Sequence, residues 1–374
     1  MNIAFFFTYG YALKTWEESG TLERELKTLK ILSKNYGYKF TLVTYGDFDD
    51  TLIKNVSEEF NIIPIYSIIK KRNSKFINYL FSFTIPFKLR NTFKNIDVIH
   101  QHQLLGSWVV IILKLLVKKP LLTRTGYDMY LFAKNEKKNV FLIYLYKLLT
   151  KLTIWFSDIY TVTSMCDFNY LNTSIRTKKK LLYRPNFIEQ NETNPLENRY
   201  QNKILAVGRL VEQKNFKILI EEFKDTKDHF EINIVGEGKL ENELKALAIK
   251  NNVDLKLIGS VSYEELKNIY QKYRYFISTS LFEGNPKTLL EAMASGCVVL
   301  ASNISNHIEI IENGLNGYIF KLNNPQLLNK INQLKNDINL QTKISNNAIE
   351  NVYKKNSLEN LISLLDEDYK LIKS

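Results

Sequence analysis

The chain has 374 residues, of which 45% are hydrophobic, so it is long enough for two domains with packed cores. Its two cysteines, Cys166 and Cys297, are too few for a disulfide scaffold or a cysteine-based metal site and suit a reducing compartment. The formal net charge is +12, and the excess lies in the first half: residues 1–185 hold 28 Lys and Arg against 14 Asp and Glu, whereas residues 186–374 hold 23 against 25.

The first half alternates between strand patterns and helical patterns. Strands are predicted at 2–8, 39–45, 61–66, 97–100, 120–124 and 159–163, and helices at 20–34, 104–117 and 137–156. This alternation predicts a parallel sheet covered on both faces. The opening apolar run is too short for a signal peptide and fits a buried strand, which favours a cytoplasmic protein.

Two segments of the first half indicate contact with a membrane surface. Residues 61–96 contain seven bases, no acid and seven interleaved aromatic residues, a composition that suits anionic lipid headgroups. A solvated basic loop is the alternative, and nucleic acid is disfavoured as a partner because no recognised nucleic-acid module accompanies the charge. Residues 140–156 are apolar, but Lys147 and Lys151 interrupt them at helical spacing. This pattern predicts an amphipathic helix in a core or at an interface, not a membrane span.

The second half repeats the alternation after a polar segment at 185–202, which is the predicted linker. Strands are predicted at 203–207, 230–235, 254–258, 274–278 and 297–301, with helices near 214–225, 239–250, 262–271 and 287–295. Residues 324–374 show helical patterns only. The expected domains are 1–185 and 200–350, with a terminal helix at 351–374.

Four motifs of the second half follow predicted strand ends, at 208–214, 236–238, 259–261 and 279–291. Because ligands bind outside the carboxyl ends of such strands, these motifs should meet at one edge of the sheet. Asn285 and Pro286 are the predicted N-cap and first residue of a helix whose free amides would face an anion such as a diphosphate.

Three charged side chains fit the same site. Arg209 and Lys214 would stabilise charge on phosphate oxygens, although a solvated helix start is the alternative for both. Glu291 lies in an apolar helix, where its carboxylate needs donors such as the two hydroxyls of a diol. A salt bridge within the helix is the alternative for Glu291.

The block E-G-N-P-K-T-L-L-E-A-M-A-S-G, from Glu283 to Gly296, resembles the signature of family 4 of the retaining nucleotide-sugar glycosyltransferases. Stretches at 207–215, 235–238, 258–261 and 313–317 agree with it. The resemblance implies an α/β chain of the GT-B fold, with two Rossmann-like domains whose parallel sheets face each other across a cleft. It also implies a last helix that crosses back onto the first domain and a reaction that needs no metal or other cofactor.

The resemblance further implies roles for individual residues. Glu283 would contact the hydroxyls of the donor sugar, Glu291 the ribose, and Arg209 and Lys214 the phosphates. The predicted donor site consists of Gly208, Arg209, Lys214, Gly236, Val261, Glu283, Gly284, Asn285, Lys287, Thr288, Leu289 and Glu291. The predicted catalytic residues are Glu283, Arg209, Lys214 and His102.

On the acceptor side, Gly20, Arg124 and Asp128 are expected. Many relatives carry a His-Gly pair where this chain has Thr125 and Gly126, so the role of that histidine is expected to fall to His102, Arg124 or Asp128.

Two other motifs carry less weight. Residues 47–49 read Asp-Phe-Asp, the D-x-D metal pattern of a different glycosyltransferase fold, but their loop composition favours a surface turn. Neither G-x-G-x-x-G after the first strand nor a Walker loop is present, which disfavours a dehydrogenase or an ATPase.

These observations predict a glycosyltransferase at the cytoplasmic face of a membrane. It would move a sugar from a nucleotide diphosphate sugar to the hydroxyl of a lipid-linked sugar or a growing polysaccharide. The alternatives are a nucleotide-sugar epimerase of the same fold, a non-catalytic sugar-nucleotide-binding partner in an assembly complex, and a soluble enzyme with a free sugar or small thiol acceptor.

Overall fold

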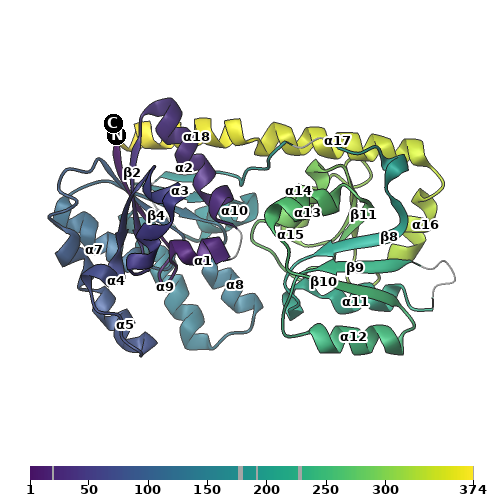
Figure 1. Cartoon of the computed structure of the whole chain (residues 1–374). Coiled ribbons are helices and arrows are strands. Elements are labelled where there is room, and N and C mark those ends of the chain that lie inside the picture. The colour runs from purple at the N-terminus through teal and green to yellow at the C-terminus, as the bar shows by residue number, and fades with distance from the viewer. Residues whose placement is uncertain (19–20, 176–179, 191–192, 226–229, 374) are drawn as a thin grey trace. The chain divides into compact units, whose positions relative to one another are not determined.

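The structure is a computed structural model that describes residues 1–18, 21–175, 180–190, 193–225 and 230–373 (Figure 1). The chain divides into two compact units. Unit 1 comprises Met1–Pro185 and Glu359–Ser374, and unit 2 comprises Asn186–Leu358. Each unit is built on its own parallel sheet with flanking helices, so the predicted pair of α/β sheets is confirmed.

Within the described residues, unit 1 has a seven-stranded sheet in the order β3-β2-β1-β4-β5-β6-β7. Its strands are β1 (Asn2–Phe6), β2 (Lys39–Thr44), β3 (Asn61–Pro64), β4 (Val98–His102), β5 (Leu121–Thr125), β6 (Ile159–Val162) and β7 (Lys180–Tyr183). Every pair is parallel, so all carboxyl ends lie at one edge of the sheet. The sequence patterns identified the first six strands but missed β7, whose four residues follow a polar, basic run.

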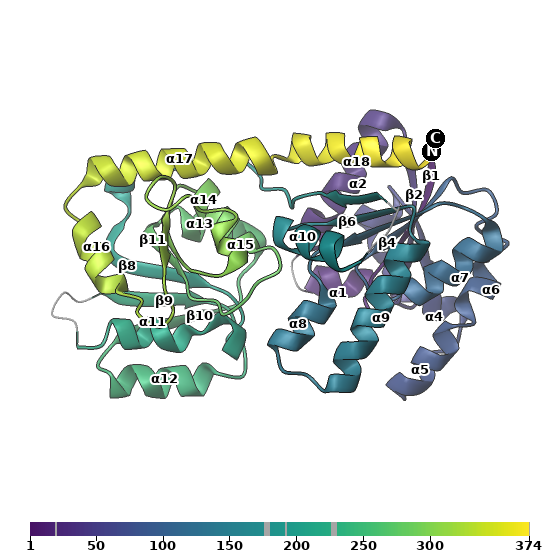
Figure 2. The same cartoon turned by 180° about the vertical axis from the view of Figure 1, so that it is seen from behind.

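Helices flank the sheet of unit 1, as Figures 1 and 2 show from opposite sides. They are α1 (Leu13–Glu18), α2 (Leu22–Tyr36), α3 (Lys54–Ser57), α4 (Ile65–Ile68), α5 (Lys75–Ser82), α6 (Ile85–Leu89), α7 (Ser107–Val117), α8 (Met129–Asn135), α9 (Val140–Phe156), α10 (Met165–Ser174) and α18 (Leu358–Lys373), with a 3-10 helix η1 (Phe48–Leu52). Strand residues alternate between the two layers: Phe6 packs toward α7, and Phe5 packs against His100 on the other side.

The helix predicted at 137–156 begins later than expected. Lys137 adopts a left-handed backbone conformation with φ of 52°, which a helix interior cannot contain. Asn139 then caps α9, because its side-chain oxygen accepts a hydrogen bond from the amide of Phe141 at 2.8 Å. The separate helix α8 ends before this cap, at Asn135. None of the helices in the described part of the chain is long and apolar enough to cross a membrane.

The last helix, α18, is part of the core of unit 1. Tyr369 is fully buried, and its hydroxyl lies 2.5 Å from Nδ1 of His100. The carboxylate of Asp368 is fully buried and accepts two hydrogen bonds from Arg184, at 2.6 and 2.8 Å. These contacts hold α18 against strands that come from the other end of the sequence.

Unit 2 has a six-stranded parallel sheet in the order β10-β9-β8-β11-β12-β13 within the described residues. The strands are β8 (Tyr200–Val207), β9 (Glu231–Val235), β10 (Asp254–Gly259), β11 (Tyr273–Ser278), β12 (Val298–Ser302) and β13 (Tyr318–Phe320). The helices are η2 (Leu196–Asn198), η3 (Glu212–Lys214), α11 (Phe216–Glu222), α12 (Glu241–Lys250), α13 (Tyr263–Tyr270), α14 (Lys287–Ala294), α15 (Ser305–Ile308), α16 (Leu327–Leu334) and α17 (Ile338–Asn356). Each face of the sheet carries its own apolar core.

Two connections differ from the sequence-based expectations. The predicted linker at 185–202 is mostly packed into unit 2, because the guanidinium of Arg199 donates to the carbonyls of Asn194 and Ser295 at 2.6 and 2.8 Å. The predicted helix at 351–374 is interrupted at Ser357, which has an extended backbone. The amide of Ile188 donates to the carbonyl of Asn356 at 2.7 Å, which fixes this break beside the start of unit 2.

Loss of the Arg184–Asp368 pair should destabilise unit 1. The Asp368→Ala variant leaves the guanidinium without its buried partner, so we expect the free energy of unfolding to fall by about 3 kcal/mol. All three tryptophans of the chain, Trp16, Trp108 and Trp155, belong to unit 1, so tryptophan fluorescence during urea unfolding measures this unit selectively. The control is Lys14→Ala, which breaks an exposed pair with Asp49 in the same unit and should cost about 0.5 kcal/mol or less. Equal, small effects of the two variants would contradict the structural role of α18.

Candidate functional site

The four sequence motifs of unit 2 meet at the carboxyl edge of its sheet. They follow β8, β9, β10 and β11, which are neighbours in the sheet. Backbone hydrogen bonds connect the loops in sequence: the amide of Gly236 donates to Gly259 at 2.8 Å, that of Gly208 to Val235 at 2.9 Å, and that of Leu281 to Gln213 at 2.8 Å. The edge is therefore a connected set of loops.

Glycine is required where two of these loops approach each other most closely. Gly236 has a φ of 139°, and a Cβ atom there would lie 2.1 Å from the carbonyl oxygen of Gly208. A Cβ at Gly208 would lie 2.8 Å from the Cε atom of Lys214. Both glycines thus allow the loops after β8 and β9, and the Lys214 side chain, to pack without a gap.

Lys214 and Glu283 form an ion pair, with Nζ and Oε1 2.5 Å apart. Their side chains are only 15% and 8% exposed, so both charges are largely removed from water. Glu283 also accepts hydrogen bonds from Ser280 Oγ at 2.6 Å and from Gln213 Nε2 at 3.4 Å. Two residues predicted separately as donor contacts are therefore partners in the structure without ligand.

The loop that carries Glu283 is held from several directions. The side-chain amide of Asn306 donates to the carbonyl of Gly284 at 2.5 Å, and Ser302 Oγ donates to the carbonyl of Ser280 at 2.6 Å. Thr279 Oγ1 donates to the carbonyl of Lys214 at 2.7 Å. Thr279 falls in the predicted motif at 279–291, but Ser302 and Asn306 were not predicted. Ser302 ends β12 and Asn306 follows it, so both belong to the same edge.

His307 lies beneath this loop and is fully buried. Burial lowers the pKa of its imidazole to about 4, so the ring is neutral at neutral pH. Its Nδ1 donates to the carbonyl of Ser302 at 2.9 Å, and Nε2 is 3.4 Å from Ser278 Oγ. The ring therefore joins β11 to β12 directly behind the loop.

Helix α14 begins at Lys287, one residue later than predicted. Pro286 is its N-cap and has a ψ of 75°, outside the helical region, so Asn285 precedes the cap and does not form it. The carbonyl of Pro286 accepts hydrogen bonds from the amides of Leu289 and Leu290 at 3.0 and 3.2 Å. Lys287 and Thr288 occupy the half-buried first turn, and Leu289 is buried behind them.

Glu291 faces the interior of unit 2 and is 8% exposed. Its carboxylate accepts a hydrogen bond from the hydroxyl of Tyr270, on α13, at 3.2 Å. Burial and this carboxylate raise the pKa of Tyr270 well above its ordinary value. The predicted contact of Glu291 with a ribose stays a prediction, and the tyrosine is the protein group that orients the carboxylate.

Two other predicted donor residues lie at the same edge. Arg209 follows β8 and is exposed, and among the described residues its guanidinium forms no hydrogen bond or ion pair. Val261 is half-buried and follows β10. Arg209 can thus bind an anion without first leaving a partner.

In unit 1, His102 and Arg124 are register partners at the carboxyl ends of β4 and β5. The imidazole of His102 packs against the rings of Phe5 and Trp16, with centroids 5.6 and 5.9 Å away. Arg124 donates to the carbonyls of Arg184 and Pro185 at 3.3 and 3.4 Å. Burial lowers the pKa of Arg124 to about 10, so it keeps its charge at neutral pH.

Asp128 and Thr125 both have structural partners. Asp128 is buried and caps α8, since its Oδ1 accepts from the amide of Leu131 at 2.7 Å; burial raises its pKa. Thr125 is buried and donates to the carbonyl of Thr161 at 3.4 Å. Their predicted roles toward an acceptor stay predictions, and Gly20 lies outside the described residues.

The D-x-D segment forms a turn, as its composition favoured. Asp47 caps the 3-10 helix η1 by accepting from the amide of Asp49 at 3.2 Å. In the part of the chain that the structure describes, no three His, Cys, Asp or Glu side chains gather to hold a metal ion.

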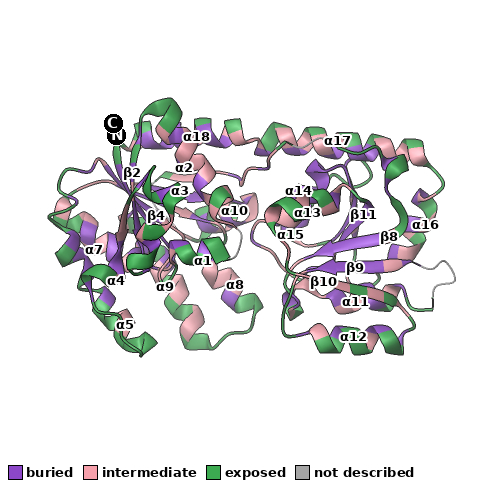
Figure 3. Cartoon of the chain, in the orientation of Figure 1, coloured by how far each residue is buried: buried purple, intermediate pink, exposed green. Residues whose placement is uncertain are grey.

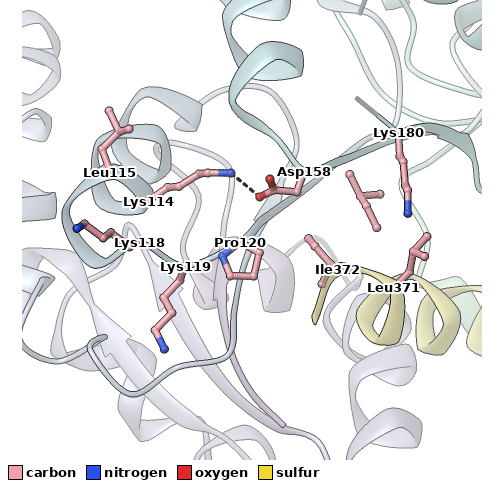
Figure 4. Close-up of a pocket in the computed structure, with 10 residues that line it drawn as sticks. Lys114, Leu115, Lys118, Lys119, Pro120, Asp158, Lys180, Leu371 and Ile372 are labelled. Carbon is pink, nitrogen blue, oxygen red and sulfur yellow. Dashed lines mark hydrogen bonds and ion pairs between the residues drawn. The ribbon is translucent and has the colours of Figure 1, made fainter. Parts of the chain in front are cut away.

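A separate cavity of 630 Å³ lies at the opposite, amino edge of the unit 1 sheet (Figure 4). Its lining combines four lysines with one acid, Asp158, which pairs with Lys114. The lining residues are Lys114, Leu115, Lys118, Lys119, Pro120, Asp158, Ile159, Lys180, Leu371 and Ile372. The lining residues precede β5, surround the starts of β6 and β7, and include two residues of α18. This cavity is therefore distinct from the carboxyl edge where the predicted residues lie.

Two units with parallel sheets, one carrying a charged loop set at its carboxyl edge, define a glycosyltransferase of the GT-B fold, and the comparisons with known proteins agree. Residues 187–351 match the family described as "Glycosyl transferases group 1". The chain is therefore similar to the group 1 glycosyltransferases, whose family it matches through unit 2.

Three curated relatives resemble most of the chain. The uncharacterized glycosyltransferase MJ1178 of Methanocaldococcus jannaschii is 29% identical over 83% of this chain and 84% of its own length. The capsular polysaccharide biosynthesis glycosyltransferase CapH of Staphylococcus aureus is 27% identical over 77% and 79%. A Campylobacter jejuni α-1,4-N-acetyl-D-galactosaminyltransferase, named for an acceptor on PP-undecaprenol, is 24% identical over 88% and 89%.

A solved structure shares the fold along the whole chain. Anabaena HepE, crystallised in complex with UDP and glucose, has a TM-score of 0.74 and 16% identity, with 99% of each chain covered.

The close approach at Gly236 makes a specific prediction. In Gly236→Ala the new methyl group would meet the Gly208 carbonyl, so we expect the free energy of unfolding of unit 2 to fall by about 3 kcal/mol. Gly314→Ala is the matched control, because Gly314 also has a positive φ, 81°, but nothing lies within 4 Å of its Cβ position. Its cost should be only about 1 kcal/mol of backbone strain. Urea unfolding followed by far-UV circular dichroism measures both, and equal losses would show that close packing of the loops is not the cause.

Proposed function

We propose that this glycosyltransferase moves a sugar, with retention of configuration and without a metal ion, from a nucleotide diphosphate sugar to a hydroxyl acceptor. The observation that carries this proposal is the Lys214–Glu283 pair, which lies beside Arg209 and the first turn of α14 at one sheet edge. The complex of HepE with UDP and glucose supports a sugar nucleotide as the donor.

The residues of unit 2 account for stabilisation of the leaving group. As the bond between the anomeric carbon and the phosphate oxygen breaks, negative charge increases on the diphosphate. Arg209, Lys214 and the amides at the start of α14 would stabilise that charge, which is the part usually played by a metal ion. Glu283 would accept hydrogen bonds from sugar hydroxyls, and Glu291 from the ribose diol.

In a single displacement, retention requires that the acceptor attack from the side that the leaving group vacates. The acceptor oxygen then forms its bond to the anomeric carbon while the diphosphate departs. The departing phosphate oxygen can take the acceptor's proton, so the step needs no separate base. We propose that His102 of unit 1, whose ring packs against two aromatic side chains, contacts the reacting sugar.

The proposed acceptor is a sugar on a lipid diphosphate carrier or a growing polysaccharide. The names of CapH and of the C. jejuni relative support these classes. The charge of the chain also supports them, since the excess of Lys and Arg is confined to unit 1 and a diphosphate carrier is anionic.

We propose that the enzyme works at the cytoplasmic surface of a membrane through α5 and α6. Apolar and aromatic side chains are exposed there beside the bases of residues 70–94. Figure 3 colours much of α5 as exposed. The exposed apolar residues are Phe76, Ile77, Leu80, Phe81, Phe83 and Phe87. The bases of such a surface attract anionic headgroups, and its aromatic rings pack at the boundary between headgroups and acyl chains.

Removal of the Arg209 guanidinium should abolish most of the transfer. Because Arg209 is exposed, Arg209→Ala should fold normally and lower kcat roughly a hundredfold or more. The control is Lys256→Ala, which removes an exposed base from β10 and should leave kcat unchanged. The assay combines candidate UDP-sugars with lipid-linked acceptors and detects product by mass spectrometry. Full activity of Arg209→Ala would contradict the phosphate site. An altered sugar formed from the donor alone would indicate an epimerase. Donor binding without turnover would indicate a non-catalytic partner.

Membrane contact through bases predicts a strong dependence on salt. Binding to phosphatidylglycerol vesicles, measured by flotation, should fall roughly tenfold or more between about 0.1 M and about 0.5 M NaCl, because salt screens charges at the surface. Vesicles of phosphatidylcholine alone are the control and should bind weakly at both concentrations. Equal binding to both lipids would refute the electrostatic contact.

A further inference from the structure

The start of α9 presents an exposed apolar surface. Five large apolar side chains there are exposed, with Val140 at 80%, Phe141 at 77% and Tyr144 at 69%. They recur at helical spacing and therefore form one face: Val140, Phe141, Tyr144, Leu145 and Leu148. We call this set the apolar tip.

Lysines surround the apolar tip. Lys134, Lys137 and Lys138 precede it, Lys147 and Lys151 follow within α9, and Glu136 is the single acid between 129 and 156. Glu136 is itself paired with Lys138, at 3.3 Å. The surface is therefore an apolar centre with a positive border, which is complementary to an anionic lipid bilayer.

The position of the tip matches that of α5. In Figures 1 and 2, the end of α9 that begins at Val140 and helix α5 both extend at the lower end of unit 1. Figure 3 shows exposed residues at both places. A single flat surface can thus touch both elements.

A second copy of the chain fits the tip less well than a bilayer does. Residues 1–185 hold 28 bases against 14 acids, so two such units brought face to face would repel each other. The same charge attracts an anionic bilayer. The aromatic members of the tip, Phe141 and Tyr144, also suit the boundary between headgroups and acyl chains.

We propose that the apolar tip of α9 inserts into the acyl boundary of an anionic membrane and anchors unit 1 there. This inference extends the proposed function, on which it rests, because it adds an apolar anchor to the electrostatic contact of α5 and α6. The anchor holds the enzyme at the surface where a lipid-linked acceptor resides. It also remains effective at salt concentrations that screen the lysines.

The test compares two exposed apolar residues on helices of different units. Phe141→Glu places a charge in the tip, whereas Ile249→Glu does so on α12 of unit 2, where Ile249 is 82% exposed. Flotation with phosphatidylglycerol vesicles at about 0.5 M NaCl isolates the apolar part of binding. We expect Phe141→Glu to lower this binding at least tenfold and Ile249→Glu to leave it unchanged. Equal binding of the two variants would overturn the proposal.

Insertion itself is measured with a fluorophore. Phe141→Cys and Ile249→Cys are labelled in a Cys166→Ser background, in which the remaining Cys297 is buried. With vesicles, the emission at position 141 should shift to shorter wavelength and be quenched by brominated lipids, while that at position 249 should not change. If the emission at position 141 does not change in vesicle-bound protein, insertion is overturned. Light scattering gives a second test: dimers of the protein that Phe141→Glu dissociates would identify a protein interface and would also overturn insertion.

These readouts separate the inference from the proposed function. Vesicle binding and quenching need no donor or acceptor, so they can fail while sugar transfer to a water-soluble acceptor succeeds. Conversely, insertion without any sugar transfer would support the anchor and contradict the proposed reaction.

Discussion

The candidate site depends on the ion pair between Lys214 and Glu283. Removing two charges from water costs several kcal/mol per ion, and this pair is tolerated because Ser280 and Gln213 supply further hydrogen bonds to the carboxylate. The pair joins the loop after β8 to the loop after β11, so it fixes the distance between them. A diphosphate bound beside Lys214 would replace Glu283 as the negative partner of the lysine. Its binding would then require little rearrangement of the two loops.

Four acids of unit 1 have structural partners inside the unit. Asp128 caps a helix, Asp158 pairs with Lys114, and Asp368 is fully buried against Arg184. Asp50 is also buried and accepts from Thr44 and two backbone amides. The seven bases between Lys70 and Lys94 are by contrast all exposed, and they carry the proposed attraction for anionic lipid.

Local sequence was sufficient to predict most of the framework. Buried parallel strands appear as short apolar runs, so all but β7 and β13 were identified, and the block from Glu283 to Gly296 located the loop and helix at the site. The start of α14 was misplaced by one residue because Asn285 and Pro286 have the residue types of a cap and first turn, while the real backbone at Pro286 is not helical.

Other features depend on contacts between distant residues, which a local pattern does not contain. The hydrogen bond from Asn306 to Gly284 and the burial of His307 arise from the pairing of β11 with β12. The apolar tip illustrates the same limit: the residues from Val140 to Leu148 have the same sequence pattern whether their face is covered or exposed. Only the packed structure distinguishes the two cases.

The most direct test of the central claim is a crystal structure of the protein with UDP bound. The account predicts that the diphosphate lies at the first turn of α14, that the ammonium of Lys214 turns from Glu283 toward it, and that Glu291 accepts hydrogen bonds from the ribose. Diphosphate density elsewhere on the protein, with the Lys214–Glu283 pair intact, would contradict the account.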